Sequence, residues 1–179
     1  MKKICVYCGS RDGARPEYSR AAATLGHAML EKSLDLVYGG ASVGLMGKLA
    51  DTVLQGGGRV TGIIPEPLVN REISHAGLTE LVVVESMHER KSMMADLSDG
   101  FIALPGGIGT MDELFEILTW SHLGIHKKPC ALLNVAGYYD HLNAFMQHGV
   151  NQGFIRKETA AKLIIKDDPR GVLDLFMKS

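Results

Sequence analysis

The chain has 179 residues, of which 46% are hydrophobic and 22% are charged, and this composition is ordinary for a soluble globular protein. Its 19 basic and 20 acidic residues give a formal net charge of −1, so there is no overall positive field for nucleic acid and any anion site must be local. The apolar run after the two N-terminal lysines is too short for a signal peptide, and no segment approaches the roughly eighteen apolar residues of a membrane span. We therefore expect a cytoplasmic protein that binds neither nucleic acid nor membranes.

The hydrophobic pattern predicts strands and helices that alternate along the chain. The expected strands cover residues 3–8, 34–40, 59–67, 78–86, 100–107, 128–137 and 161–167. The expected helices cover residues 16–32, 42–58, 87–99, 110–122 and 138–154, residues 69–77 form a loop, and residues 158–179 end the chain as a helix–strand–helix segment.

Several of these strands are continuous apolar runs, which indicates a parallel sheet covered on both faces. No linker, repeat or low-complexity tract interrupts the pattern, so we expect one Rossmann-like, doubly wound α/β domain over residues 1–179. Ligands of such sheets bind outside the carboxyl ends of the strands. Three glycine clusters, CGSRDG, YGGASVGLMG and PGGIGT, are expected at that edge.

The three cysteines, Cys5, Cys8 and Cys130, are too few for a disulfide framework, and their number is odd. Cys5 and Cys8 have the spacing of a redox pair, but Cys5 lies inside an apolar strand pattern. Residues three apart on a strand also point to opposite faces. Packing in the core is the favoured interpretation, and redox or metal chemistry is the alternative.

The glycine-rich segment PGGIGTMDE separates the fifth predicted strand from the next helix. It does not match the dinucleotide fingerprint, because Asp112 replaces the last glycine, and no Gly-Lys-Ser/Thr follows as in a P-loop. Gly106, Gly107 and Gly109 still permit a close approach to the backbone, and Thr110 can cap the helix. The N–H groups and dipole of that helix suit a phosphate. A tight turn without a ligand is the alternative.

Charged residues lie close to this turn. Glu113 falls in the expected first turn of the helix, where a carboxylate complements the helix dipole. Asp112 and Glu116 can fill that role equally well, so the functional interpretation is that Glu113 faces a ligand. Arg90 and Lys91 follow the fourth strand at the same edge of the sheet, where two cations oppose the helix dipole. Cations at a helix N-terminus, where acidic residues are preferred, indicate a functional role when they lie at a ligand-binding edge. A solvated basic patch is the alternative interpretation.

Other polar and aromatic residues carry weaker signals. His122 and His126 are four residues apart, as metal ligands on one helix face can be, but no third ligand has suitable spacing, so we expect no metal. Phe115, Leu118 and Trp120 fit core or dimer contacts better than a platform for stacking a base.

The motif PGGIGTMDE fits the pattern Pro-Gly-Gly-x-Gly-Thr-x-x-Glu, and the sequence resembles the LONELY GUY family of cytokinin riboside 5′-monophosphate phosphoribohydrolases. The segments YGGASVGLMG, VTGIIPEPL, MHERK, LTWSHLGIHKKP and LLNVAGYYD are also similar to that family, and the resemblance runs from about Ile4 to Phe154. Ala41 departs from it, since many members have a third glycine there. The family was long labelled lysine decarboxylase, but nothing in this sequence identifies a pyridoxal-phosphate lysine with its partners.

The resemblance implies that water cleaves the N-glycosidic bond of a nucleoside 5′-monophosphate, often with an isoprenoid group on the adenine amine, to give free base and ribose 5-phosphate. It also implies a homodimer without a cofactor. Position by position, it makes Arg90 and Glu113 the essential catalytic pair, and Met111 and Asp112 fall on variable positions of the motif. It places the substrate-binding residues at Glu72, Arg90, Lys91, Gly107, Ile108, Gly109, Thr110, Met111, Asp112, Glu113 and Thr119.

The residue types suit this chemistry. Cleavage of such a bond builds an oxocarbenium-like sugar, which a carboxylate such as Glu113 can stabilise while it orients or deprotonates water. Arginine holds its proton too firmly to be a good general acid, so we expect Arg90 to position phosphate or stabilise charge. Lys91 and the helix N-terminus would then hold the 5′-phosphate.

Two other functions remain open from the sequence. Molybdenum cofactor carrier proteins share the fold and a similar glycine-rich turn, and they bind without hydrolysis. A general AMP nucleosidase without a hormone role is the second alternative. The Arg90 and Glu113 pair and the complete motif favour an enzyme, but the pocket for the adenine substituent cannot be identified from the sequence.

Overall fold

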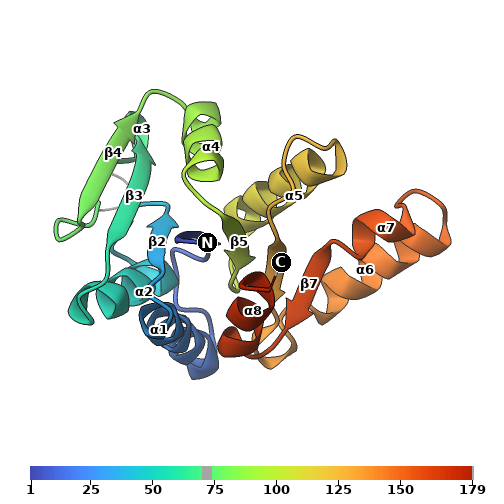
Figure 1. Cartoon of the computed structure of the whole chain (residues 1–179), viewed down its shortest axis with the longest axis horizontal. Helices are drawn as coiled ribbons and strands as arrows, with labels where there is room; N and C mark the ends of the chain where they lie inside the picture. Colours follow the sequence, from blue (N-terminus) through green and yellow to red (C-terminus); the bar gives the residue numbers. More distant parts are fainter. Residues whose placement is uncertain (70–73, 179) are drawn as a thin grey trace.

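The computed structural model describes residues 1–69 and 74–178, which form a seven-stranded sheet covered by helices (Figure 1). All six strand pairings are parallel, which confirms the predicted doubly wound α/β architecture. The strands are β1 (Lys3–Tyr7), β2 (Asp35–Tyr38), β3 (Val60–Pro65), β4 (Glu80–Val84), β5 (Gly100–Ala103), β6 (Cys130–Leu133) and β7 (Leu163–Lys166).

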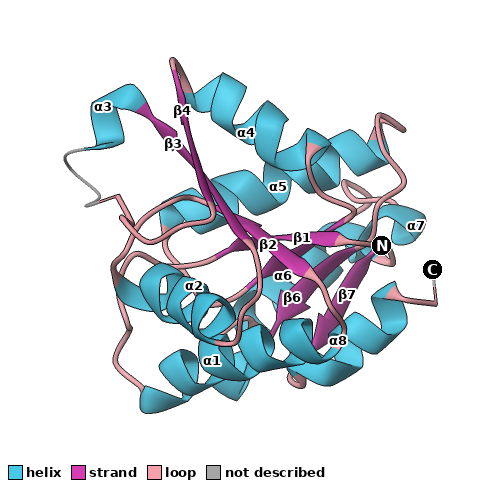
Figure 2. Cartoon of the chain, turned by 60° about the vertical axis from the view of Figure 1, so that its left-hand side comes forward, coloured by secondary structure: helices cyan, strands magenta, loops and turns pink. Residues whose placement is uncertain are grey.

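The helices form two layers, one on each face of the sheet (Figure 2). One layer contains α1 (Pro16–Glu31), α2 (Gly44–Gln55) and α8 (Pro169–Phe176). The other contains α4 (Met87–Asp96), α5 (Ile108–His122) and α6 (Asp140–Asn151). The short elements are α3 (Glu66–Val69), the 3-10 turn η1 (Val135–Gly137) and α7 (Lys157–Ala160).

Strand β1 shows how the sequence divides the core between these layers. Ile4 and Val6 join the core on the α1, α2 and α8 side, whereas Cys5 and Tyr7 join the core on the α4 and α5 side. Both faces are buried because side chains alternate along a strand and helices cover the sheet on both sides. Cys8 belongs to the core opposite to that of Cys5, so the expectation that these two thiols pack separately is confirmed.

The strand order β4-β3-β2-β1-β5-β6-β7 indicates where along the sheet a ligand crevice is expected. The chain winds outward from β1 to β4 and then returns to the other side of β1 with β5, so the direction reverses between β1 and β5. In open α/β sheets a ligand crevice forms at such a reversal, outside the carboxyl ends of the strands. Two of the glycine clusters, CGSRDG after β1 and PGGIGT after β5, meet at this point.

Several predicted boundaries differ from the structure, and two of them lie close to the cavity. Helix α5 begins at Ile108 with Gly107 as its N-cap residue, so Thr110 lies inside the helix and does not cap it. Glu113 is therefore in the second turn, and the first turn contains no acidic residue. The third strand ends at Pro65 and the chain continues into α3, where Pro67 is tolerated because it lies within the first turn.

Candidate active site

A cavity of about 280 Å³ opens at the carboxyl edge of β1, β2 and β5. Its volume is close to the lower end of the range of roughly 300–1,000 Å³ that is usual for small-molecule sites. Among the described residues, the lining contains several backbone segments, one carboxylate and one guanidinium. Its residues are Val6, Tyr7, Cys8, Gly9, Ser10, Gly39, Met46, Leu68, Met87, Arg90, Gly107, Ile108, Gly109, Thr110 and Glu113.

The turn between β5 and α5 forms one wall of the cavity. A side chain at Gly106 would overlap the hydroxyl of Thr110, which is itself buried, so the turn can close only with glycine at that position. At Gly107 and Gly109 a Cβ would meet no atom within 4 Å, so both face open space. No side chain caps α5, which leaves the N–H groups at its N-terminus for a ligand, and these groups favour anions.

Helix α4 brings Arg90 to the opposite wall. The helix starts well, because the hydroxyl of Ser86 accepts a hydrogen bond from the backbone N–H of Glu89 at 3.1 Å. Glu89 also places a carboxylate near the positive end of the helix dipole. Arg90 is the fourth residue of the helix and is 5% exposed. The start of α4 therefore accommodates the cation that the sequence places there.

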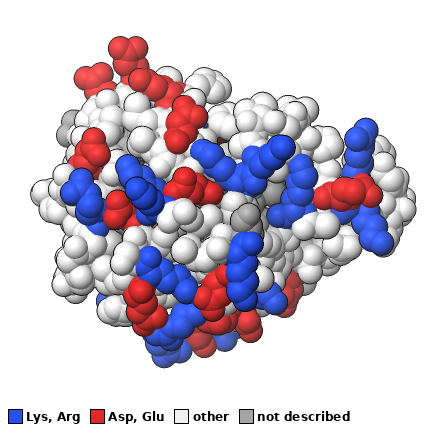
Figure 3. All heavy atoms as spheres, viewed as in Figure 1, with Lys and Arg blue, Asp and Glu red and all other residues white. Residues whose placement is uncertain are grey.

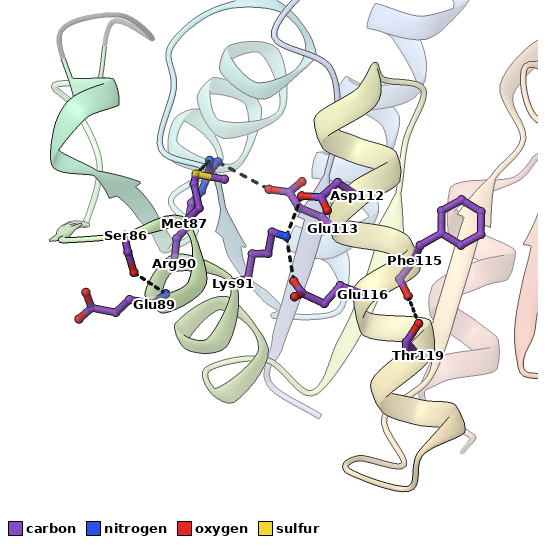
Figure 4. A network of polar contacts seen from close by, with 10 residues as sticks. All are labelled: Ser86, Met87, Glu89, Arg90, Lys91, Asp112, Glu113, Phe115, Glu116 and Thr119. Atoms are coloured by element: carbon purple, nitrogen blue, oxygen red, sulfur yellow. Dashed lines mark hydrogen bonds and ion pairs between the residues drawn. The ribbon is translucent and has the colours of Figure 1, made fainter.

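Arg90 and Glu113 face one another across the cavity (Figure 4). Nη2 of Arg90 lies 3.8 Å from Oε1 of Glu113, and the two side chains are 7% and 11% exposed. Nη2 also donates a hydrogen bond of 3.3 Å to the carbonyl oxygen of Gly39. Among the described lining residues, Glu113 is the only carboxylate and Arg90 the only lysine or arginine. Charge–charge interactions are strong in such a buried site.

One nitrogen of Arg90 is a buried donor that a ligand could use. Within the described residues, Nε is buried and has no hydrogen-bond partner, whereas Nη1 contacts the sulfur of Met87 at 3.8 Å. A buried donor without a partner costs stability, and such groups in native proteins are usually paired or serve a function. An oxygen or nitrogen of a bound molecule would satisfy this donor.

Cys8 also lines the cavity, but its thiol is not an activated nucleophile. Burial raises the pKa of Cys8 far above its ordinary value, and the negative charge of Glu113 raises it further. Burial likewise raises the pKa of Tyr7, with smaller contributions from Cys5 and Glu113. The Cys8 thiol and the Tyr7 hydroxyl therefore stay neutral, and the charged side chains of the described lining are those of Arg90 and Glu113.

Lys91 and Thr119 lie outside the lining of this cavity. The ammonium of Lys91 pairs with Asp112 at 2.7 Å and with Glu116 at 3.1 Å, between α4 and α5 (Figure 4). The hydroxyl of Thr119 donates to the carbonyl oxygen of Phe115 at 2.7 Å. The chain thus brings together most of the predicted substrate-binding residues on the two walls, and it places Lys91, Asp112 and Thr119 on the neighbouring helix surface.

Of the remaining predictions, Met111 is half-buried against the core and does not line the cavity. Glu72 lies outside the described residues. Sequence reasoning missed several lining residues. A signal for Gly39 and Met46 was present, since both belong to the glycine cluster YGGASVGLMG, and Met87 opens the MHERK segment, whereas Leu68 has no signature beyond its apolar character.

The two histidines that suggested a metal have structural partners instead. Nδ1 of His122 lies 2.8 Å from the hydroxyl of Thr159, and Nε2 of His126 lies 2.8 Å from the carbonyl oxygen of Ile117. Across the described part of the chain, no group of three or more His, Cys, Asp and Glu side chains has the arrangement of a metal site. No helix in the described ranges is long and apolar enough to cross a membrane.

The surface agrees with the balanced composition. Acidic and basic side chains are interspersed over the face shown in Figure 3, without one dominant sign. This face therefore lacks the broad basic patch that is typical of nucleic-acid-binding faces. Anion binding is instead favoured at one local point, the N-terminus of α5.

Comparison with known proteins gives consistent results. A family model described as "Possible lysine decarboxylase" matches residues 46–176. The cytokinin riboside 5′-monophosphate phosphoribohydrolase of Rhodococcoides fascians is 49% identical over 96% of this chain and 87% of its own length. The enzyme LOG7 of Arabidopsis thaliana, which has the same name, is 52% identical over 87% of this chain and 71% of its own length.

Solved structures share the fold at low sequence identity. The molybdenum cofactor carrier protein of Chlamydomonas reinhardtii matches with a TM-score of 0.74 and 18% identity over 99% of both chains. The structure of TM1055 matches with a TM-score of 0.75 and 22% identity over the whole of both chains. These likenesses establish the architecture alone, because proteins with one fold can have unrelated functions.

Proposed function

Because the chain belongs to the family of cytokinin riboside 5′-monophosphate phosphoribohydrolases, we propose that it hydrolyses the N-glycosidic bond of adenosine 5′-monophosphate or its N6-substituted derivatives. The products are free base and ribose 5-phosphate. The observation that carries this proposal is the buried pair of Arg90 and Glu113, 3.8 Å apart, beside an uncapped helix N-terminus in one cavity.

The two walls of the cavity suit different parts of the substrate. The N-terminus of α5, with Gly107 and Gly109 open to solvent, is a site for the 5′-phosphate. Glu113 lies one and a half turns further along the same helix, so a ribose held by its phosphate would reach the carboxylate. Leu68, Met46 and Met87 add apolar surface that suits a base.

The proposed reaction is a single displacement by water. The water oxygen bonds to C1′ of the ribose, the C1′–N9 bond breaks, and its electron pair leaves with the base. The water loses one proton and the base gains one. Glu113 stabilises the positive charge that develops on the sugar and orients or deprotonates the water. Arg90 stabilises negative charge and supplies the unpaired Nε–H to an acceptor on the substrate.

The description "Possible lysine decarboxylase" does not fit this cavity. A pyridoxal-phosphate decarboxylase needs a lysine that forms a Schiff base with the cofactor. The described lining contains no lysine, and Lys91 is engaged with Asp112 and Glu116 outside it. We therefore derive no step through that cofactor.

A carrier that binds without hydrolysis is the alternative. The structural likeness to molybdenum cofactor carrier proteins supports their fold for this chain, but at 18% identity it carries no statement about the ligand. The relatives at about half identity have the hydrolase name, and the carboxylate–guanidinium pair has no evident role in passive binding.

We further propose that residues 1–179 act as one nucleotide-binding hydrolase domain in the cytoplasm and that two copies form a homodimer. The exposed apolar side chains of Phe115, Leu123 and Ile125, on α5 and just after it, support a protein contact there. Lys91 and Thr119 lie on or beside the same helix, so their predicted contact with substrate would need such a second copy. Sedimentation equilibrium tests this, and a monomer at all concentrations would contradict it.

The decisive experiment is chromatographic. The purified protein is incubated with AMP, with isopentenyladenosine monophosphate, and with the dephosphorylated riboside of each, and free base is measured. We expect base from the monophosphates only, and the ratio of the two rates defines the preferred substrate. Binding of AMP without any release of base would support the carrier instead.

A further inference from the structure

Two consecutive tyrosines hold the β5–α5 turn from the side opposite the catalytic cavity. The hydroxyl of Tyr138 donates a hydrogen bond of 2.6 Å to the carbonyl oxygen of Gly106. The hydroxyl of Tyr139 donates one of 2.6 Å to the carbonyl oxygen of Leu104. Tyr138 and Gly106 line a second cavity of about 510 Å³, which shares Gly9, Ser10, Gly107 and Ile108 with the catalytic cavity. The glycine-rich turn, together with the loop after β1, thus borders both cavities.

The backbone of the segment after β6 turns so that both tyrosines reach the β5–α5 turn. Ala136 and Gly137 both adopt positive φ, at 53° and 74°, which turns the chain sharply back toward the sheet. The side chain of Asn134 fixes the turn, because its Oδ1 accepts from the N–H of Tyr139 and its Nδ2 donates to Asp140, both at 2.7 Å. Such a costly backbone arrangement persists only where the surroundings determine it.

The two hydrogen bonds differ in their surroundings. Tyr139 is 1% exposed and its bond belongs to the core, whereas Tyr138 is 42% exposed and its hydroxyl could reach water instead. The ring of Tyr138 is held by edge-to-face contacts with Tyr18 at 5.6 Å and with Tyr139 at 4.9 Å. The position of its hydroxyl is therefore set by packing, and the turn adapts to it.

The carbonyl of Gly106 and the N–H of Gly107 belong to the same planar peptide group and point in opposite directions. Fixing the carbonyl toward Tyr138 therefore fixes the N–H away from Tyr138. A peptide between two glycines can rotate easily because neither neighbour has a Cβ. Around Gly107 a Cβ would meet no atom within 4 Å, so there is room on that side of the peptide for the group to rotate, although Gly106 on the other side packs closely against Thr110.

We propose that Tyr138 is a positioning residue: its hydroxyl locks the Gly106–Gly107 peptide so that the N–H of Gly107 faces the catalytic cavity and donates to the 5′-phosphate. This inference rests on the proposed function, since it assigns the phosphate to that cavity. Without the hydroxyl the peptide samples both orientations, and in one of them the carbonyl oxygen meets the phosphate. The expected defect is weaker binding of phosphorylated ligands, with the chemical step unchanged.

The test compares Tyr138→Phe with the wild type and with Tyr18→Phe, a control in the same cavity. Both substitutions remove one hydroxyl and keep the ring. For Tyr138→Phe we expect the KM for AMP to rise about five- to tenfold with kcat within about twofold, and ribose 5-phosphate to bind about five- to tenfold more weakly by calorimetry. Binding of adenosine, which lacks the phosphate, stays unchanged. Tyr18→Phe leaves all four values at the wild-type level.

A purely structural role gives another pattern. If Tyr138→Phe lowers the melting temperature and leaves the KM for AMP and the affinity for ribose 5-phosphate unchanged, the proposal is overturned. An equal loss of affinity for adenosine and AMP also overturns it, because the defect then does not lie at the phosphate. If the wild type binds ribose 5-phosphate but releases no base, the hydrolase proposal fails while the binding comparison still decides the role of Tyr138.

Discussion

The guanidinium group of Arg90 lies against the backbone of Gly39 at the end of β2, and a Cβ on Gly39 would overlap Nη2. The same Nη2 donates to the carbonyl oxygen of Gly39 at 3.3 Å and faces Glu113 at 3.8 Å. Strand β2 therefore places one partner of the buried pair, although Gly39 has no side chain with which to act. Gly39 contributes its carbonyl oxygen as an acceptor, and the absence of a side chain leaves space for the guanidinium group.

A methyl group at Gly39 tests this relationship. In Gly39→Ala the guanidinium must move away from β2, so we expect kcat/KM for AMP to fall at least about tenfold, which corresponds to about 1.4 kcal/mol of transition-state stabilisation. The same kcat/KM for AMP, measured in an Arg90→Ala background, provides the control. If Gly39 acts through Arg90, adding Gly39→Ala to that background has no further effect. A tenfold additional loss there would show that Gly39 acts by another route.

Replacement of the carboxylate tests the chemical step. Glu113→Gln keeps the size of the side chain but can neither take up a proton nor stabilise positive charge on the sugar as a carboxylate does. We expect kcat for AMP to fall by about 10²- to 10⁴-fold while the affinity for AMP stays within a few-fold. Glu116→Gln on the same helix, outside the cavity lining, is the matched control and keeps kcat near the wild-type value. Full turnover by Glu113→Gln would refute the catalytic assignment.

The sequence predicts the main features of the site because they follow from topology. Strands β4 and β5 are parallel to the rest of the sheet, so the segments after them, with Arg90 and Glu113, both begin at its carboxyl edge. The start of α5 was misplaced because Thr110 satisfies the local preference for a capping residue. In the structure the helix instead begins at Ile108, and the buried Thr110 side chain lies so close to Gly106 that a Cβ there would overlap it.

Other features depend on contacts that no local pattern contains. The role of Gly39 requires a side chain 51 residues away, and the hydrogen bond of Tyr138 to Gly106 spans 32 residues. The direction of Lys91 is also a tertiary outcome. It is the neighbour of Arg90 in the sequence, but the 100° rotation per residue of a helix, from 3.6 residues per turn, points it toward α5 and away from the cavity lining. There Asp112 and Glu116 determine its position.

Lys91 allows a prediction about alkaline stability. Burial alone would lower the pKa of Lys91, but hydrogen bonds with Asp112 and Glu116 outweigh burial and raise that pKa above its ordinary value of 10.5. A raised pKa in the folded state means that the pairing stabilises the protein below the unfolded pKa and is lost as the pH rises through the folded one. The free energy difference between the wild type and Lys91→Met should therefore be constant from about pH 7 to 9 and shrink above about pH 10.5.

A double-mutant cycle isolates the ion pair itself. Urea unfolding at pH 8 of the wild type, Lys91→Met, Glu116→Gln and the double variant should give a coupling of about 0.5–1 kcal/mol, the usual size for a partly exposed pair. The coupling should decrease in high salt, because screening weakens exposed pairs. A coupling of zero, or one that does not respond to salt, would mean that Lys91 stabilises α4 and α5 through the packing of its aliphatic stem instead.

Tyr139 allows the complementary prediction to that for Tyr138. Its hydroxyl is buried and donates to the carbonyl oxygen of Leu104, so Tyr139→Phe leaves a buried acceptor without this donor. We expect a loss of about 1–3 kcal/mol in the free energy of unfolding. At roughly 2–4 °C per kcal/mol for a chain of this size, this lowers the melting temperature by several degrees. The KM for AMP should change less than in Tyr138→Phe, because the Gly106–Gly107 peptide keeps its own hydrogen bond. A Tyr139→Phe protein with wild-type stability would show that water or a local shift satisfies the Leu104 carbonyl.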